Sequence, residues 1–297
     1  MTTPRWRALS SSERRLSATQ RWRFDLAYDG TGLRGFAFQP ETTTVVGLIR
    51  ETLARTLRLE HDPQVVGAGR TDAGVHAFAQ VIHVDLPSPL FSTNRGPEAE
   101  RLVASLNAQM AGRVRILRAL PVDNDFHARF SASWRAYRYL VLEDAAPALA
   151  LSDAWSWAVH GPLDLDLMNA ASAQLLGTHD FRAFCRRPSN AKTSEPLLRH
   201  VLEATWRRVE DTMAISATGA PALRFDVRAV SFCHNMVRSI TSTLVAIGQG
   251  REGENTVKER LESLERAFLP PPAPARGLSL VGVGYEAFAG GPSGFVR

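Results

Sequence analysis

The sequence predicts an α+β fold in which a largely antiparallel sheet is flanked by helices. Runs with strand-like alternation are interleaved with runs of helical period along the chain. The strand-like runs are apolar on one side only, which favours an antiparallel sheet over a doubly wound parallel one. A length of 297 residues is enough to bury a substantial core. We expect two similar α+β halves, at residues 21–118 and 119–288.

The predicted elements of the first half surround one bend in the chain. Residues 22–28 alternate Trp, Phe, Leu and Tyr with polar or small residues, as a half-buried strand does. Residues 44–59 repeat apolar side chains at helical spacing. A short strand at residues 64–69 leads into the bend, and an alternating strand at residues 79–86 leads out of it. The bend at residues 67–76 therefore lies between two strands.

The rest of the chain continues this mixture of strands and helices. A helix at residues 98–110 would place Leu102, Leu106 and Met110 on one face. Further elements are expected as strands at 114–120, 134–142, 200–209, 223–230 and 278–285, and as helices at 164–176, 232–247 and 255–268. A rigid proline-rich connector at residues 269–277 precedes the last strand.

Composition and charge favour a soluble, cytosolic protein with a polyanionic partner. Hydrophobic residues make up 44% of the chain and charged residues 22%, without an apolar run of membrane-spanning length. The net charge is +5 and the pI about 9.7. Residues 1–20 carry +3 of that charge and lack an apolar period, so we expect a disordered basic tail there. A loose tail is expected at residues 289–297.

The cysteines and histidines do not predict a metal site. Cys185 and Cys233 lack the spacing of a zinc site, and a disulfide is not expected in a cytosolic protein. We therefore expect two reduced, partly buried thiols. His76 and His83 bracket a strand without a second pair of donors, and a lone histidine is more often structural than a ligand.

The bend GAGRTDAGVH, residues 67–76, places one carboxylate, that of Asp72, among small residues. A dinucleotide-binding loop needs a third glycine where Asp72 stands, and no Gly-Lys-Ser/Thr sequence closes a P-loop here. The chain has no Gly-x-Ser-x-Gly sequence, which excludes a hydrolase nucleophile elbow. The small residues instead leave space for a flat reactant beside the carboxylate.

Asp72 has two interpretations on local grounds. A cation nearby, for which Arg70 is the neighbour in sequence, favours an ionised carboxylate in a closed pocket. An ionised, partly dehydrated aspartate acts as a nucleophile or a base. Aspartate in a glycine-containing turn also commonly caps backbone amides, and the bend alone leaves both interpretations open.

GRTDAGVH at residues 69–76 is one of several short motifs that follow one another along the chain. The others are YDGT at 28–31, LNAQM at 106–110, DFHARFSA at 125–132, YRY at 137–139, GTHDF at 177–181, FCHNMVRSI at 232–240 and LSLVGVGY at 278–285. Over residues 22–287 the chain resembles the bacterial tRNA pseudouridine synthases of the TruA type, whose catalytic aspartate matches Asp72. The chain departs from the family's usual pattern at Phe36, which stands where a tryptophan is common.

The resemblance implies the pseudouridine synthase fold with a central basic cleft, and it assigns roles to individual residues. Asp72 would be the essential aspartate, and Arg238 would be its ion-pair partner in preference to Arg70, whose side chain can diverge from that of Asp72 in the bend. Arg70 would order the loop or contact RNA. Tyr137 would be the aromatic residue at the target base, although Tyr139 lies on the same side of the predicted strand.

Two basic segments are expected near the site. A helix over residues 232–247 would place His234 and Arg238 four positions apart on one face. Residues 185–200 carry four further basic side chains that form either an RNA-binding rim or a solvated loop.

The resemblance also implies a reaction, the isomerisation of uridine to pseudouridine at positions 38, 39 and 40 in the anticodon arm of tRNA. This reaction adds no atom and changes no oxidation state, so no cofactor is expected. The expected partners are tRNA and a second copy of the chain in a homodimer. Two alternatives stay open: a noncatalytic RNA-binding α+β protein, which would not need Asp72, and a nucleotide-binding enzyme that uses the glycine-rich bend.

Overall fold

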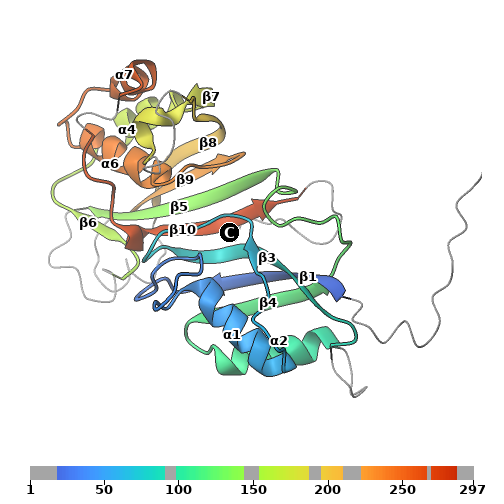
Figure 1. Ribbon diagram of the computed structural model, residues 1–297. Helices are drawn as coiled ribbons and strands as arrows, with labels where there is room; N and C mark the ends of the chain where they lie inside the picture. The colour runs from blue at the N-terminus through green and yellow to red at the C-terminus, as the bar shows by residue number, and fades with distance from the viewer. Residues whose placement is uncertain are drawn as a thin grey trace, which may run out of the picture.

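The computed structural model describes most of the chain between residues 19 and 285. The described ranges are residues 19–90, 98–143, 154–186, 195–209, 222–265 and 269–285. In them ten strands form one mixed, mostly antiparallel sheet with helices packed beside it (Figure 1), so the predicted α+β class is confirmed. Residues 1–18 of the expected basic tail and all of the expected tail at 289–297 lie outside the described ranges.

The last strand in chain order lies at the centre of the sheet. In chain order the strands are β1 (Thr19–Tyr28), β2 (Val66–Gly67), β3 (His76–Pro87), β4 (Val114–Pro121), β5 (Trp134–Glu143), β6 (Trp157–Val159), β7 (Gly177–Asp180), β8 (Leu198–Val209), β9 (Ala222–Ala229) and β10 (Leu278–Gly284). Their order in the sheet is β4-β1-β3-β10-β5-β9-β8-β7, with β2 beside β3 and β6 beside β5. Only the pairs β10–β3 and β5–β6 are parallel among the described strands.

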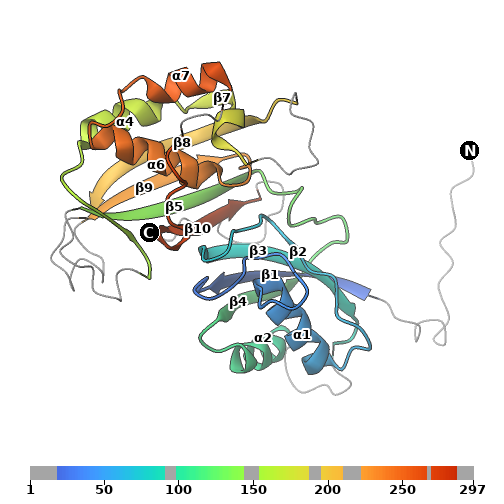
Figure 2. The same cartoon turned by 60° about the vertical axis from the view of Figure 1, so that its left-hand side comes forward.

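Helices gather at the two ends of this sheet. The helices of the described ranges are α1 (Val45–Leu57), α2 (Glu98–Gln109), α4 (Leu165–Ala173), α6 (Met236–Gly248) and α7 (Thr256–Ser263), with short 3₁₀ helices η2 (Phe181–Phe184) and η3 (Ala275–Gly277). Figures 1 and 2 show α1 and α2 beside β1 and β4, and α4, α6 and α7 beside β8 and β9. None of these helices has the length and apolar character needed to cross a membrane.

Local patterns account for the elements of the first half. The alternating aromatic and aliphatic side chains of β1 are buried, namely Trp22, Phe24, Leu26 and Tyr28. In α1 the apolar stripe is buried as well, at Val45, Ile49 and Leu53. Thr44 begins the helix because its side chain accepts a hydrogen bond from the Gly47 amide. Each large apolar side chain buried in this way stabilises the fold by about 1.5–3 kcal/mol.

The central strand β10 joins the two ends of the molecule. Ser279 pairs with His76 at the start of β3, and Leu280 pairs with Tyr137 in β5. The bend that precedes β3 is thereby placed next to the middle of β5. The domain boundary near residue 118 stays a prediction, because one continuous sheet spans both proposed halves.

Helix α6 begins later than its apolar period predicts. The predicted helix covered residues 232–247, but the first helical residue is Met236. Asn235 has a φ of 63° and a ψ of 2°, which is left-handed backbone that a right-handed helix does not contain. His234 therefore lies in the segment before the helix.

The two cysteines are bonded to each other, so the expectation of two reduced thiols is wrong. Cys185 and Cys233 form a disulfide with a Cα–Cα distance of 5.8 Å across 48 residues of sequence. They meet because η2, which ends just before Cys185, packs against α6, which begins shortly after Cys233. No local spacing signals this pairing.

Candidate active site

Hydrogen bonds from neighbouring elements hold the bend between β2 and β3 in place. The Phe36 amide donates to the Thr71 carbonyl oxygen at 3.1 Å. The hydroxyl groups of Tyr28 and Thr71 are 2.8 Å apart, and burial raises the pKa of Tyr28 to about 12, so its phenol stays neutral at pH 7. The Gln80 amide group donates to the Gly69 carbonyl oxygen at 3.0 Å. On the other side of Asp72, the Gly74 amide donates to the Leu33 carbonyl oxygen at 3.3 Å, so the backbone is fixed both before and after the candidate carboxylate.

A buried arginine that the sequence did not single out also holds this bend. The Arg135 guanidinium donates to the carbonyl oxygen of Ala68 at 2.9 Å, and to those of Ala132 and Val230, each at 2.9 Å. A further bond goes to the carbonyl of Arg129. One side chain of β5 thus ties the start of the bend to two other loops. Burial lowers the pKa of Arg135, but an arginine remains charged at neutral pH.

Two glycines of the bend are required for different structural reasons. A Cβ atom on Gly67 would lie 2.3 Å from Cζ of Phe36, so the buried phenylalanine ring excludes any larger residue there. Gly74 has a φ of 79°, a conformation that L side chains disfavour. Phe36 packs beneath the bend, in the core, at the position where the related pattern has tryptophan.

The Asp72 side chain is 29% exposed and meets a different side chain at each carboxylate oxygen. Arg238 Nη1 lies 3.3 Å from Oδ2, and His234 Nε2 lies 3.4 Å from Oδ1. Both partners lie far from the bend in sequence: His234 precedes α6, and Arg238 is in its first turn. The predicted common helix face of His234 and Arg238 is wrong, because only Arg238 is in the helix.

Arg238 is held by the proline-rich connector. Its Nε donates to the Ala273 carbonyl oxygen at 2.7 Å, and its own carbonyl oxygen accepts from the Ala273 amide at 3.1 Å. Arg238 Nη1 also donates to Oδ1 of Asn235 at 3.3 Å. The connector, residues 269–277, was expected only to be rigid, and it supplies the contacts that aim this guanidinium at Asp72.

The two tyrosines of β5 have different surroundings. Tyr137 lies beside the bend, because a Cβ atom on Gly69 would be 3.9 Å from its hydroxyl oxygen. Its ring packs edge-on against Phe232 with the ring centroids 5.1 Å apart, and burial raises its pKa. Tyr139 is fully buried and donates to the Pro274 carbonyl oxygen at 2.7 Å, which marks it as a core residue. Of the two, only Tyr137 borders the site.

Arg70 lies in the bend, but it forms no ion pair with Asp72 in the described ranges. It is exposed, and no hydrogen bond or ion pair joins it to another residue of the described ranges. The ion pair of Asp72 is made with Arg238. The basic segment at residues 185–200 is only partly described, since residues 187–194 lie outside the described ranges.

His76, the last residue of the bend motif, is a structural residue. Its Nδ1 accepts a hydrogen bond from the Gly30 amide at 3.0 Å. Its Nε2 lies 3.2 Å from the Ala154 carbonyl oxygen and 3.1 Å from that of Arg276, so the proton is assigned to Nε2. The ring stacks on Trp155 at 4.2 Å, and burial lowers the pKa of His76.

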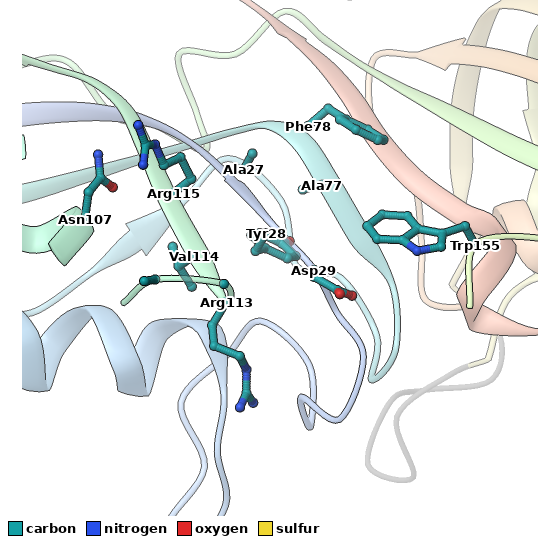
Figure 3. A pocket seen from close by; sticks show the side chains of 12 residues that line it. Ala27, Tyr28, Asp29, Ala77, Phe78, Asn107, Arg113, Val114, Arg115 and Trp155 are labelled. Carbon is teal, nitrogen blue, oxygen red and sulfur yellow. The ribbon is translucent and has the colours of Figure 1, made fainter. Parts of the chain in front are cut away.

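A pocket of about 310 Å³ lies where the end of β1, the start of β3 and the start of β4 meet (Figure 3). Its lining residues are Ala27, Tyr28, Asp29, Ala77, Phe78, Asn107, Ala111, Gly112, Arg113, Val114, Arg115 and Trp155. Neither Asp72 nor either of its two partners is among them. Tyr28 connects the two places, since its hydroxyl contacts Thr71 in the bend. The pocket is therefore separate from the carboxylate site.

The second half of the chain matches a known family model, described as tRNA pseudouridine synthase, over residues 171–286. This range includes Arg238 and the connector, but the bend with Asp72 precedes it.

Relatives named tRNA pseudouridine synthase A match nearly the whole chain. The one from Cutibacterium acnes is 37% identical over 267 residues, which is 90% of this chain and 89% of the relative. The one from Caulobacter sp. (strain K31) is 38% identical over 90% of this chain and 98% of its own length. The one from Frankia casuarinae is 40% identical over 89% of each chain. This chain therefore belongs to the tRNA pseudouridine synthase A family.

Proposed function

We propose that this protein isomerises uridine to pseudouridine at positions 38, 39 and 40 in the anticodon arm of tRNA, with Asp72 as the nucleophile or base. Membership of the family makes the chain an isomerase that acts on tRNA uridines. The observation that carries the role of Asp72 is its geometry: a partly exposed carboxylate held between Arg238 and His234 in a fixed bend.

The reaction breaks the bond between N1 of uracil and C1′, rotates the base and forms a bond from C5 to C1′. The proton on C5 leaves and N1 gains a proton, so the product is an isomer of the substrate and no cofactor is needed. Asp72 has three routes into this chemistry: attack on C6, attack on C1′, or removal of the C2′ proton to give a glycal. All three need the carboxylate within contact distance of the nucleotide.

The neighbouring residues have complementary roles. Arg238 balances the charge of Asp72 and keeps the carboxylate oriented. The target uridine must leave its stack to reach Asp72, at a cost of a few kcal/mol. Tyr137 lies beside the bend and offsets part of that cost by contact with the everted base. Arg70, exposed in the same bend, contacts the RNA backbone.

The wider setting follows from the same proposal. The partners are tRNA and a second copy of the chain, and the enzyme works in the cytoplasm, where tRNA is processed. The net charge of +5 supports binding to the phosphate backbone. Residues 21–118 form the half that supplies Asp72, and residues 119–288 form the half that supplies Tyr137 and Arg238.

The decisive variant is Asp72→Asn, which keeps the shape of the side chain and removes its charge. We expect pseudouridine formation to fall by at least about 1,000-fold, the scale on which loss of a nucleophile acts. Affinity for tRNA and the unfolding temperature should stay close to wild type. The measurement is tritium release from tRNA labelled at C5 of uridine.

Two outcomes would contradict the proposal. Equal turnover by Asp72→Asn would remove the nucleophile role. Wild-type protein that binds tRNA without releasing tritium would instead support the noncatalytic RNA-binding alternative. Mass-spectrometric mapping of pseudouridine in tRNA, with and without the gene, tests positions 38, 39 and 40.

A further inference from the structure

We infer that His234 is a second positioning residue for Asp72, one that fixes the carboxylate oxygen that Arg238 does not hold. This inference rests on the proposed role of Asp72. His234 Nε2 lies 3.4 Å from Oδ1, whereas the Arg238 contact is made to Oδ2 at 3.3 Å. Each oxygen of the carboxylate therefore faces a different side chain, with a hydrogen bond from the Arg238 guanidinium to Oδ2 and the His234 imidazole beside Oδ1.

The two partners differ in their access to solvent. The His234 side chain is 51% exposed, while that of Arg238 is 19% exposed. His234 consequently stands on the open side of Asp72, where RNA must approach, and Arg238 lies on the enclosed side. Catalytic contacts that are long in the free enzyme commonly tighten when substrate binds, and the distance of 3.4 Å allows such tightening.

The backbone of His234 is anchored independently of the bend. Its carbonyl oxygen accepts a hydrogen bond from the Arg186 amide at 3.0 Å. The preceding residue, Cys233, is bonded to Cys185. The following residue, Asn235, has the left-handed conformation that starts α6. These three anchors place the imidazole at Asp72 without help from Asp72 itself.

A single contact leaves a carboxylate free to pivot about it. With Arg238 alone, Asp72 Oδ2 would stay in place while Oδ1 could rotate away from the reacting nucleotide. Small misplacements of a reacting group cost large factors in rate. His234 therefore acts on the catalytic step, and its loss should lower kcat while it leaves KM for tRNA nearly unchanged.

The test compares His234→Ala with His234→Gln in steady-state assays on tRNA. The glutamine amide can reach Oδ1 with an N–H donor, whereas alanine cannot. We expect kcat of His234→Ala to fall by about 10- to 100-fold with KM within about twofold. His234→Gln should recover most of the loss. His61→Ala, which changes an exposed histidine between α1 and β2, serves as the matched control and should behave as wild type.

Three results would overturn the inference: wild-type kcat in His234→Ala, a loss confined to KM, or equal losses in the alanine and glutamine variants. Wild type and Asp72→Asn are assayed alongside. An inactive wild type or a fully active Asp72→Asn would overturn the proposed function and this inference with it. An active wild type, an inactive Asp72→Asn and an unaffected His234→Ala would overturn the inference alone.

Discussion

Asp72 and His76 lie four residues apart in one bend, yet their surroundings are opposite. The Asp72 side chain is 29% exposed and its contacts are with other side chains, whereas His76 is 1% exposed and its ring nitrogens contact three backbone groups as well as the Asp29 carboxylate. Side-chain contacts can be rearranged by a substrate, but buried backbone contacts hold the fold together. The same short motif therefore contains the residue proposed to be reactive and a structural one.

Arg238 tests the reactive side of this comparison with the largest expected effect after Asp72. Arg238→Ala removes the contact to Oδ2 of Asp72 and should lower the single-turnover rate by about 100-fold. Arg238→Lys should also lower the rate, because a lysine ammonium cannot hydrogen-bond the Ala273 carbonyl oxygen and Asp72 at the same time with the geometry of a guanidinium. A wild-type rate in Arg238→Ala would show that the ion pair is not needed, and a wild-type rate in Arg238→Lys would show that the guanidinium geometry is not needed.

His76 tests the structural side. His76→Ala leaves the Gly30 amide without its acceptor and opens a cavity under Trp155. We expect the free energy of unfolding in urea to fall by about 2–4 kcal/mol. Asp72→Asn, measured in the same way, should change it by less than about 0.5 kcal/mol. Equal losses of unfolding free energy in the two variants would contradict a structural role that belongs to His76 and not to Asp72.

Two glycines of the same segment sharpen the comparison at a smaller scale. Gly67→Ala places a methyl group 2.3 Å from Phe36 and should lower the free energy of unfolding by about 1–3 kcal/mol. Gly69→Ala is the matched control, since its methyl group would have its nearest neighbour, the Tyr137 hydroxyl, at 3.9 Å. Thermal unfolding of both proteins should rank Gly67→Ala clearly below Gly69→Ala, and the reverse ranking would contradict this packing.

Lowering the pH should reduce the free energy of unfolding through the buried histidines. His83 Nδ1 accepts a hydrogen bond from the Ala128 amide, and burial lowers the pKa of His83 to about 4. In the unfolded chain its pKa is about 6.5, so between these values only the unfolded chain binds the proton. The free energy of unfolding should therefore fall as pH drops from about 6.5 to about 4, and His76 adds to the same trend.

Urea unfolding at several pH values, together with NMR titration of the histidine rings, measures this effect. A His83 ring that gains its proton near pH 6.5 in the folded protein would contradict the burial described above.

Much of the fold was predictable because its signals are local. Alternation defined β1 and β3, helical period defined α1, and the glycine-rich motif located Asp72 between two strands. The antiparallel character followed from strands that are apolar on one side. The pairing of Asp72 with Arg238 was anticipated only through the resemblance, because 166 residues separate them.

The features that the sequence did not predict all depend on contacts between distant segments. The apolar period predicted that α6 begins at residue 232, but the left-handed backbone of Asn235 delays its start to Met236. No local sequence pattern indicates the Cys185–Cys233 bond or the hydrogen bond from Arg238 to the Ala273 carbonyl oxygen. His234 was expected on the basic face of a helix, yet it contacts Asp72 from the segment before that helix.

The place of β10 has a consequence for biosynthesis. Among the described strands, the one that separates β3 from β5 is also the last to emerge from the ribosome, after the elements on both of its sides have been made. Until it inserts, the first half has an open edge at β3 and the second an open edge at β5. Nascent chains that stop short of residue 278 would thus hold the Asp72 carboxylate and the Arg238 guanidinium on two unjoined parts of the sheet, and the two would meet only after β10 has been made.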